Sequence, residues 1–217
     1  MLRKLFDKKG EGAPSGEGQF LSADKYPRYS GAWSTMRKRL KAEQGLRIID
    51  SGTTSPTNIN YLTNLGHSIF LADPLQEACG GSWERGKDAD DNVIWDVQGF
   101  MDQTLEFSGR MFDVVLLWTT LDYLPEPFVV PLVNHLHAWM NPGGQVLAFF
   151  HTGQRNEDKQ YCRFSVTDTD EVEMQAARAY PIQRAFTNRS IQSLFSRFSG
   201  FKQFLAKDAL SECIITR

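Results

Sequence analysis

The chain has 217 residues, of which 41% are hydrophobic and 23% charged, which is enough for one α/β domain with a sizeable core. Its 24 basic and 26 acidic residues give a net charge of -2, so the composition gives no reason to expect a nucleic-acid or membrane partner. No apolar run reaches the roughly 18 residues of a membrane span.

Residues 1–30 are predicted to form a flexible tail. The stretch 8–18 reads KKGEGAPSGEG and contains no large apolar residue, a composition typical of flexible linkers. A domain is predicted over residues 31–217. It begins with a helix within 30–44, because Trp33, Met36 and Leu40 recur on one helical face.

Residues 46–74 contain the clearest motif. An apolar run, LRII, ends at Asp50 and is followed by the turn-forming residues SGTTSP. A helical pattern then ends at Gly66, and a second apolar run, IFLA, ends at Asp73. This order predicts the strand–helix–strand unit of a parallel sheet, with free backbone N–H groups at the start of the helix.

This stretch resembles the first motif of class I S-adenosylmethionine-dependent methyltransferases, which reads acidic-x-Gly-x-Gly-x-Gly. Asp50 and Gly52 match it, and Thr54 and Pro56 stand at the positions of the second and third glycines. The resemblance implies that Asp50, Gly52 and Thr54 bind S-adenosylmethionine and that Asp73 holds its ribose hydroxyls.

Weaker patterns follow. Residues 76–91 are predicted to be a charged loop with a weak helical piece. Its aspartates at 88, 90 and 91 are interpreted as solvated side chains, with no metal site predicted, and residues 92–95 are predicted to be a third strand. The run FDVVLLW, ending at Trp118, predicts a central buried strand. Before it, the resemblance implies that Met101 and Asp102 contact the adenine, and it adds Trp118 to the cofactor site.

The remaining elements complete a Rossmann-like three-layer sandwich, with a mostly parallel sheet and a terminal antiparallel strand. The sequence predicts a helix over 131–140 with Pro131 in its first turn, a strand over 145–150, a hairpin over 161–174, a helix over 190–198, and strands over 201–206 and 212–216. The hairpin belongs to an insertion of about residues 155–180. It is interpreted either as a lid over the site or as a packing element.

The expected reaction is methyl transfer, in which the protein mainly positions the acceptor. The acceptor site is expected beyond the carboxyl ends of the strands, where Trp118 and Tyr123 provide an apolar wall. His151 follows the next strand and is the candidate general base, with a plain surface histidine as the alternative.

The predicted function is therefore an S-adenosylmethionine-dependent methyltransferase acting on a small molecule. Two alternatives remain: a non-catalytic scaffold, because bulk at Thr54 and Pro56 narrows the cofactor loop, and an adapter that binds a partner through its tail. Three widely spaced cysteines fit a reducing cytoplasm better than a disulfide frame. The protein is expected to be cytoplasmic, without nucleic-acid or membrane partners, and a monomer or homodimer.

Overall fold

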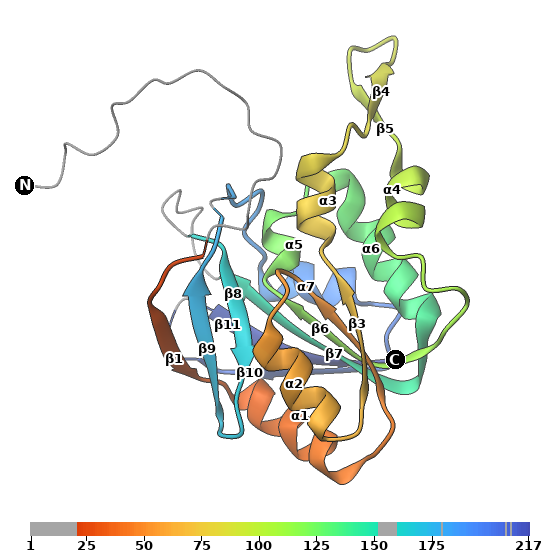
Figure 1. Ribbon diagram of the computed structural model, residues 1–217. Coiled ribbons are helices and arrows are strands. Elements are labelled where there is room, and N and C mark those ends of the chain that lie inside the picture. The colour runs from red at the N-terminus through yellow and green to blue at the C-terminus, as the bar shows by residue number, and fades with distance from the viewer. Residues whose placement is uncertain (1–20, 152–159, 179, 207, 209) are drawn as a thin grey trace, which may run out of the picture.

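The structure is a computed structural model that describes residues 21–151, 160–178, 180–206, 208 and 210–217. Its main sheet has six strands in the order β10-β11-β7-β6-β2-β3 (Figure 1). These strands are β2 (Arg47–Ser51), β3 (Ser68–Ala72), β6 (Phe112–Trp118), β7 (Met140–His151), β10 (Gly200–Phe204) and β11 (Leu210–Thr216). Strands β2, β3, β6 and β7 are parallel, and β11 runs antiparallel to β7 and β10. The predicted fold class is confirmed.

The central strand β6 is covered on both faces. Val114 and Leu116 pack into one apolar core, and Val115 and Leu117 pack into the other. Because successive side chains of a strand point to opposite faces, a continuous apolar run is what a strand between two layers requires.

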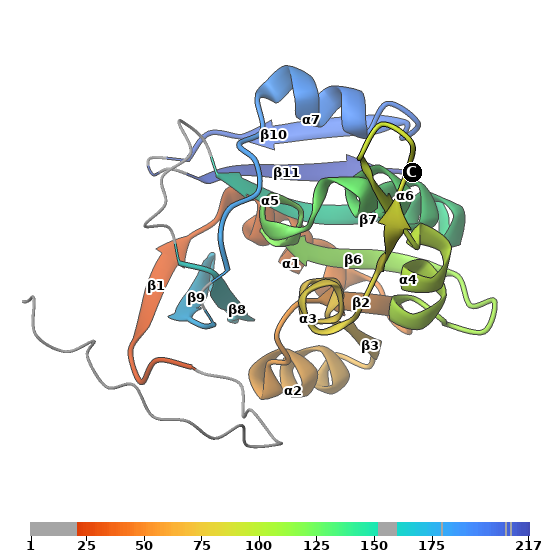
Figure 2. The same ribbon diagram turned by 90° about the horizontal axis from the view of Figure 1, so that it is seen from above.

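Seven helices are described, and most of them cover the two faces of the sheet (Figure 2). They are α1 (Gly31–Ala42), α2 (Pro56–Asn64), α3 (Pro74–Gly80), α4 (Val97–Thr104), α5 (Thr120–Tyr123), α6 (Glu126–Trp139) and α7 (Asn188–Leu194). Helices α1 and α2 contribute to one core, whereas α4, α6 and α7 contribute to the other. Among the described residues, no helix has both the length and the apolar composition needed to cross a bilayer.

A second sheet has the order β1-β9-β8 and is entirely antiparallel. Its strands are β1 (Lys25–Tyr29), β9 (Glu171–Ala176) and β8 (Cys162–Val166). The predicted tail is therefore wrong for residues 25–29, whose sequence, KYPRY, has no clear apolar alternation and forms a strand only by pairing with a distant partner. The rest of the predicted tail, residues 1–20, lies outside the described residues.

A buried ion pair holds β1 to the main sheet. The Arg28 guanidinium binds the carboxylates of Glu212 and Asp208. Glu212 also accepts hydrogen bonds of 2.9 Å from the Ser30 hydroxyl and from the Ala32 backbone N–H. One buried carboxylate thus joins β1, the start of α1 and β11, and its donors offset the cost of removing a charge from water.

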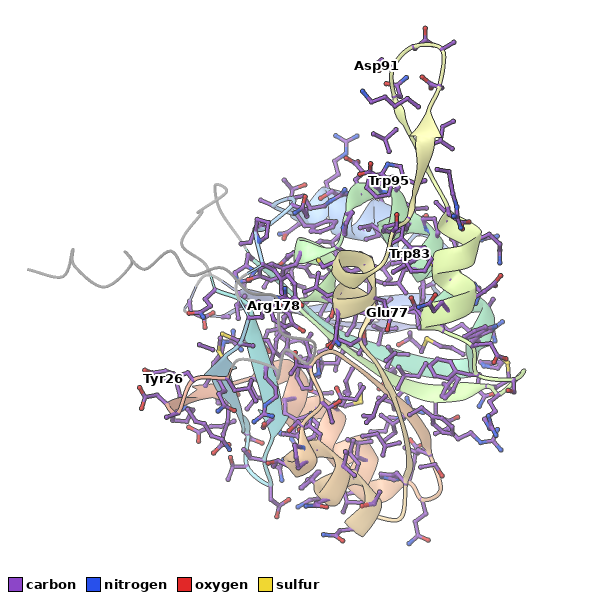
Figure 3. The ribbon with its side chains drawn as sticks, turned by 45° about the horizontal axis from the view of Figure 1, so that its top comes forward. Tyr26, Glu77, Trp83, Asp91, Trp95 and Arg178 are labelled. Atoms are coloured by element: carbon purple, nitrogen blue, oxygen red, sulfur yellow. The ribbon has the colours of Figure 1, made fainter. Side chains whose placement is uncertain are left out.

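The third strand predicted over residues 92–95 is wrong as a member of the main sheet. Residues Val93–Trp95 form β5, which pairs with β4 (Glu84–Lys87) in a two-stranded hairpin. Figure 3 shows this hairpin projecting from the body, with Asp91 near its tip and Trp83 and Trp95 at its base. A strand of three residues with Ile94 exposed has too little apolar surface to lie between two helical layers.

Helix α6 begins at Glu126, so Pro131 lies inside the helix and the prediction of a start at Pro131 is wrong. The earlier start buries Phe128 and Val129 completely in the core. This apolar burial offsets the backbone hydrogen bond that a proline inside a helix cannot make. Helix α7 likewise begins before its predicted start, at a capping box formed by Thr187 and Ser190.

The hairpin β8–β9 is a packing element. Phe164, Val166 and Val172 are buried in the same core as α1 and α2, and the Phe164 ring stacks on Trp118 with centroids 5.2 Å apart. Asn58 of α2 accepts a hydrogen bond of 2.7 Å from the Val166 backbone N–H. Because its apolar face is part of the core, the hairpin is not a detachable lid.

We therefore expect Phe164→Ala to lower the free energy of unfolding by about 3–5 kcal/mol, the usual cost of deleting a buried aromatic side chain. At this chain length such a loss lowers the melting temperature by at least about 6 °C. Urea denaturation measures the change. Tyr26→Ala, at a residue of β1 that is 60% exposed, is the control. A loss below about 1 kcal/mol for Phe164→Ala would contradict this packing role.

Candidate active site

The candidate site lies where the parallel strands end at their carboxyl termini. The turn between β2 and α2 stands at the centre of this edge, beside the end of β3, and the turn that follows β6 and the end of β7 stand next to it (Figure 2). Ligands of open α/β sheets bind beyond these strand ends. The Gly52 backbone N–H donates to the Ala72 carbonyl at 2.8 Å, which fixes the ends of β2 and β3 together.

Asp50 lies buried beneath the turn, 3% exposed. Its carboxylate accepts hydrogen bonds from the Asn58 amide at 2.8 Å and from the Trp118 indole N–H at 2.7 Å. Burial nevertheless dominates and raises the pKa of Asp50 to about 6. Asp50 is therefore a buried brace between α2 and the end of β6.

Gly52 provides a close approach between the turn and a tyrosine. A Cβ at this position would lie 3.1 Å from the Tyr161 hydroxyl and 3.6 Å from Trp118 Cδ1. The Tyr161 hydroxyl is hydrogen-bonded by the backbone and side chain of Thr53, and burial raises the pKa of Tyr161, so the hydroxyl stays neutral. The space above Gly52 is thus occupied by an aromatic side chain of the insertion.

Asp73 stands at the end of β3 and caps α3, where its Oδ1 accepts from the Gln76 N–H at 3.0 Å. Burial raises the pKa of Asp73. This carboxylate is close enough to Tyr161 and Tyr180 to act on their titration electrostatically. Asp73 therefore lies in the electrostatic neighbourhood of the aromatic cluster that adjoins Gly52.

A second pair of polar side chains follows β6 and β7. Asp122 of α5 is fully buried, and its Oδ2 accepts from the His151 backbone N–H at 2.8 Å and from His151 Nδ1 at 2.7 Å. The Tyr123 ring stands edge-on to His151, with centroids 5.7 Å apart, and edge-on to Tyr161 at 5.2 Å. Through these rings, His151 is connected to the turn at Gly52.

The other predicted site residues lie in three settings. The Thr54 carbonyl accepts from Arg163 of β8 at 3.1 Å, so the insertion covers this part of the turn. Met101 and Asp102 both belong to α4. The Met101 side chain is buried in the core, and the Asp102 carboxylate accepts a hydrogen bond from Gln98 on the exposed side of the helix. No described contact joins Met101 or Asp102 to Gly52.

Trp118 adjoins both Asp50 and Gly52, but its ring packs in the core with Phe164. Tyr123 instead packs with Tyr161.

Sequence reasoning placed Asp122 beyond the end of a strand, but it did not predict three contacts of this arrangement. Asn58 links Asp50 to the backbone of β8, Tyr161 covers Gly52, and Asp122 orients His151. Only Asp122 had a usable signal, because it follows one parallel strand and His151 ends the next, so the two must meet at one edge. Nothing local to the sequence places Asn58 or Tyr161 at the turn.

The residues fit the cofactor that the resemblance implies. Gly52 lacks a side chain at the turn, and the Asp73 carboxylate is an acceptor suited to ribose hydroxyls. Tyr123, Tyr161 and Tyr180 form a wall of rings beside them, a surface that favours a cationic sulfonium. Within the part of the chain that the structure describes, no group of acidic, histidine or cysteine side chains is arranged to hold a metal ion.

Comparisons with known proteins point to the same chemistry. A family model described as "Methyltransferase domain" matches residues 25–202, more than half of the chain. A search of curated proteins found no match.

Among solved structures, the PH0226 protein from Pyrococcus horikoshii OT3 is similar, with 10% sequence identity over 85% of this chain and 88% of that chain and a TM-score of 0.50. The 1,6-didemethyltoxoflavin-N1-methyltransferase of Burkholderia thailandensis, with bound 1,6-didemethyltoxoflavin and S-adenosylhomocysteine, has 14% identity over 86% and 77% of the two chains and a TM-score of 0.46. A TehB-like SAM-dependent methyltransferase from Corynebacterium glutamicum has 13% identity over 85% and 87%, with a TM-score of 0.47.

The raised pKa of Asp50 predicts an unusual pH dependence of stability. The folded chain binds a proton on Asp50 below about pH 6, whereas the ordinary value is 3.8, so folding takes up a proton between these values. The contribution of this group to stability is therefore present below pH 3.8 and is lost as pH rises through 6. Between pH 7 and pH 4, we expect the unfolding free energy of wild type to rise by about 2–2.5 kcal/mol relative to that of Asp50→Asn.

Urea denaturation of both proteins across this pH range measures the difference, and subtraction removes the other groups that titrate. Asn58→Ala is a useful second background, because losing one donor to the carboxylate should make the effect larger. A slope of the opposite sign would show that the two hydrogen bonds stabilise the anion more than burial destabilises it.

Proposed function

The chain belongs to the family of methyltransferase domains, which use S-adenosylmethionine, and we propose that its methyl acceptor is a small molecule bound beside Tyr123 and His151. The resemblance read from the motif around Asp50 and Gly52 is confirmed at the level of the family. The observation that carries the proposal is the aromatic chain from Gly52 through Tyr161 and Tyr123 to His151. It joins the turn suited to the cofactor to a histidine suited to the acceptor.

The cofactor residues proposed are those the sequence indicated around the turn. Gly52 and Thr54 line the turn, Asp50 braces it from below, and Asp73 would hold the ribose hydroxyls. We retain Met101, Asp102 and Trp118 as predicted adenine or cofactor contacts. For Met101, binding would require a movement of α4, because its side chain is 3% exposed.

When bound, S-adenosylmethionine supplies an electrophilic methyl group on a sulfonium. The chain's own contribution is to hold the acceptor, exclude water and receive a proton. Tyr123, at 1% exposure, and Trp118, at 3%, are the proposed walls of the acceptor site. His151 is the proposed general base, since its ring reaches the site beside Tyr123.

A small acceptor is favoured by the enclosure of these groups. His151 has a side chain that is 13% exposed, and the tyrosines around it are mostly buried, so a polymer has little room to approach. The net charge of -2 also gives no electrostatic attraction for nucleic acid. We accordingly propose no nucleic-acid or membrane partner. A cytoplasmic location, suggested by three free cysteines, and a monomeric or homodimeric state stay predictions.

A non-catalytic scaffold is the second candidate, and one observation favours it. The Tyr161 hydroxyl lies against Gly52, in space that a ligand of the turn would need. In a scaffold this contact would be permanent. In the proposed enzyme, Tyr161 moves aside or packs against the bound cofactor.

Binding of S-adenosylmethionine tests the proposal, with Asp73→Asn as the informative variant. Asparagine caps a helix as well as aspartate does, so α3 is preserved while the charge is removed. A hydrogen bond to a charged group contributes about 1.5–3 kcal/mol, so we expect the dissociation constant to rise about tenfold or more. Isothermal calorimetry measures the constant.

Asp90→Asn, in the exposed loop between β4 and β5, is the matched control and should bind like wild type. Equal affinity of Asp73→Asn and wild type would exclude Asp73 as the ribose ligand. Absence of binding to the wild type itself would favour the scaffold.

A further inference from the structure

We propose, building on the proposed function, that Asp122 fixes the tautomer of His151 and that the acceptor is consequently an aromatic hydroxyl, a phenol-type group that loses its proton to His151 Nε2. This makes Asp122 a positioning residue and gives the acceptor a chemical class.

Asp122 is held in one orientation by several contacts. Its Oδ2 accepts from both the backbone N–H and Nδ1 of His151. Its backbone carbonyl accepts from the N–H groups of Gln183, at 2.8 Å, and Arg184, at 3.3 Å. The segment after the insertion therefore locks the short helix α5 against the end of β7.

An aspartate at this position determines which nitrogen of His151 carries the proton. An ionised carboxylate only accepts hydrogen bonds, so the 2.7 Å contact requires Nδ1 to be the donor. In the neutral imidazole, Nε2 then keeps its lone pair. Within the described part of the chain, Nε2 has no hydrogen-bond partner, so it is available to accept a proton from a bound molecule.

The nearby tyrosines do not compete for this role. Burial raises the pKa of Tyr123, Tyr161 and Tyr180, so their hydroxyls stay protonated near neutral pH. Their rings meet edge to face, with centroids 5.2 Å apart for Tyr123 and Tyr161 and 5.4 Å for Tyr161 and Tyr180. A planar aromatic acceptor matches such a wall, because edge-to-face contacts are the favoured geometry of aromatic pairs.

A positioned base favours a hydroxyl over an amine. A neutral amine attacks with its lone pair and loses its proton afterwards, whereas a hydroxyl becomes a strong nucleophile as its proton leaves. A phenol is more acidic than an aliphatic alcohol, so a positioned imidazole can take its proton as the new bond forms. In the step, the acceptor oxygen bonds to the methyl carbon, the sulfur–carbon bond breaks with its electron pair remaining on sulfur, and the hydroxyl proton passes to Nε2.

The first test is the tautomer of His151, measured by long-range ¹H–¹⁵N NMR on the full chain. We expect a protonated Nδ1 and an unprotonated Nε2 in the wild type. Saturating phenol, added together with S-adenosylhomocysteine, should shift the Nε2 resonance as it accepts a hydrogen bond. A protonated Nε2 in the neutral ring, or no response to phenol, would overturn the proposal.

The second test uses two replacements of His151 that differ in where they put an amide. In His151→Asn the side-chain amide can still donate to Asp122, but the atom equivalent to Nε2 is absent. In His151→Gln the longer side chain places its amide nearer the position of Nε2. Both should bind S-adenosylmethionine like wild type, and both should methylate catechol at least about 100-fold more slowly, the lower range for loss of a general base.

A nitrophenol that is already ionised at the assay pH separates a base from a packing residue. His151→Asn should retain most of its activity on that probe, because no proton has to be removed. His137→Asn, on α6, is the control. Methylation of benzylamine in place of the phenols, or equal losses on catechol and the nitrophenol, would overturn the proposal. Failure of the wild type to bind S-adenosylmethionine would instead refute the proposed function, which calorimetry reports separately.

Discussion

The buried carboxylate of Asp50 is the constraint on which the arrangement of the site depends. A charge at 3% exposure is costly unless donors surround it, and this one has the Asn58 amide and the Trp118 indole. Asn58 in turn bonds to the backbone of β8 at Phe164 and Val166. One hydrogen-bond network therefore joins the turn after β2, the end of β6 and the inserted hairpin. Movement of any one of them would leave a buried polar group without its partner.

The same network explains a strained residue. Trp118 has a φ of 50°, a left-handed conformation that a bulky side chain rarely adopts. Its indole is held by the bond to Asp50 on one side and by the Phe164 ring on the other. The left-handed turn ends β6 and leads into α5, which carries Asp122 and Tyr123. The strain is thus located where the chain must change direction to bring Asp122 to His151.

The elements that the sequence predicted well are those whose signal is local. Examples are the unit from Asp50 to Asp73 and the strand ending at Trp118. In both, the pattern of apolar residues within the segment itself indicates the helix or strand. Strand β1 was missed because KYPRY becomes a strand only through its ladder with β9 and the pair between Arg28 and Glu212. At the site, Asp50 and Gly52 were identifiable from spacing. Asp122 and His151 are 29 residues apart, and Tyr161 and Gly52 are more than a hundred residues apart. A local sequence pattern therefore cannot predict either contact.

The replacement of two motif glycines has a structural counterpart in this chain. Pro56 is the first residue of α2, where the missing N–H would have no helical partner in any case, and Ser55 caps the helix. The backbone carbonyl of Thr54 is bound by Arg163 of the insertion, so a contact with the inserted hairpin holds the turn at this position. Gly52 differs, because a Cβ there would crowd the Tyr161 hydroxyl at 3.1 Å, while its distance of 3.6 Å from Trp118 is an ordinary contact. The glycine that remains, Gly52, is therefore the one that lies against a side chain of the insertion. Of the two positions that lack glycine, Pro56 begins a helix and Thr54 contacts the inserted hairpin.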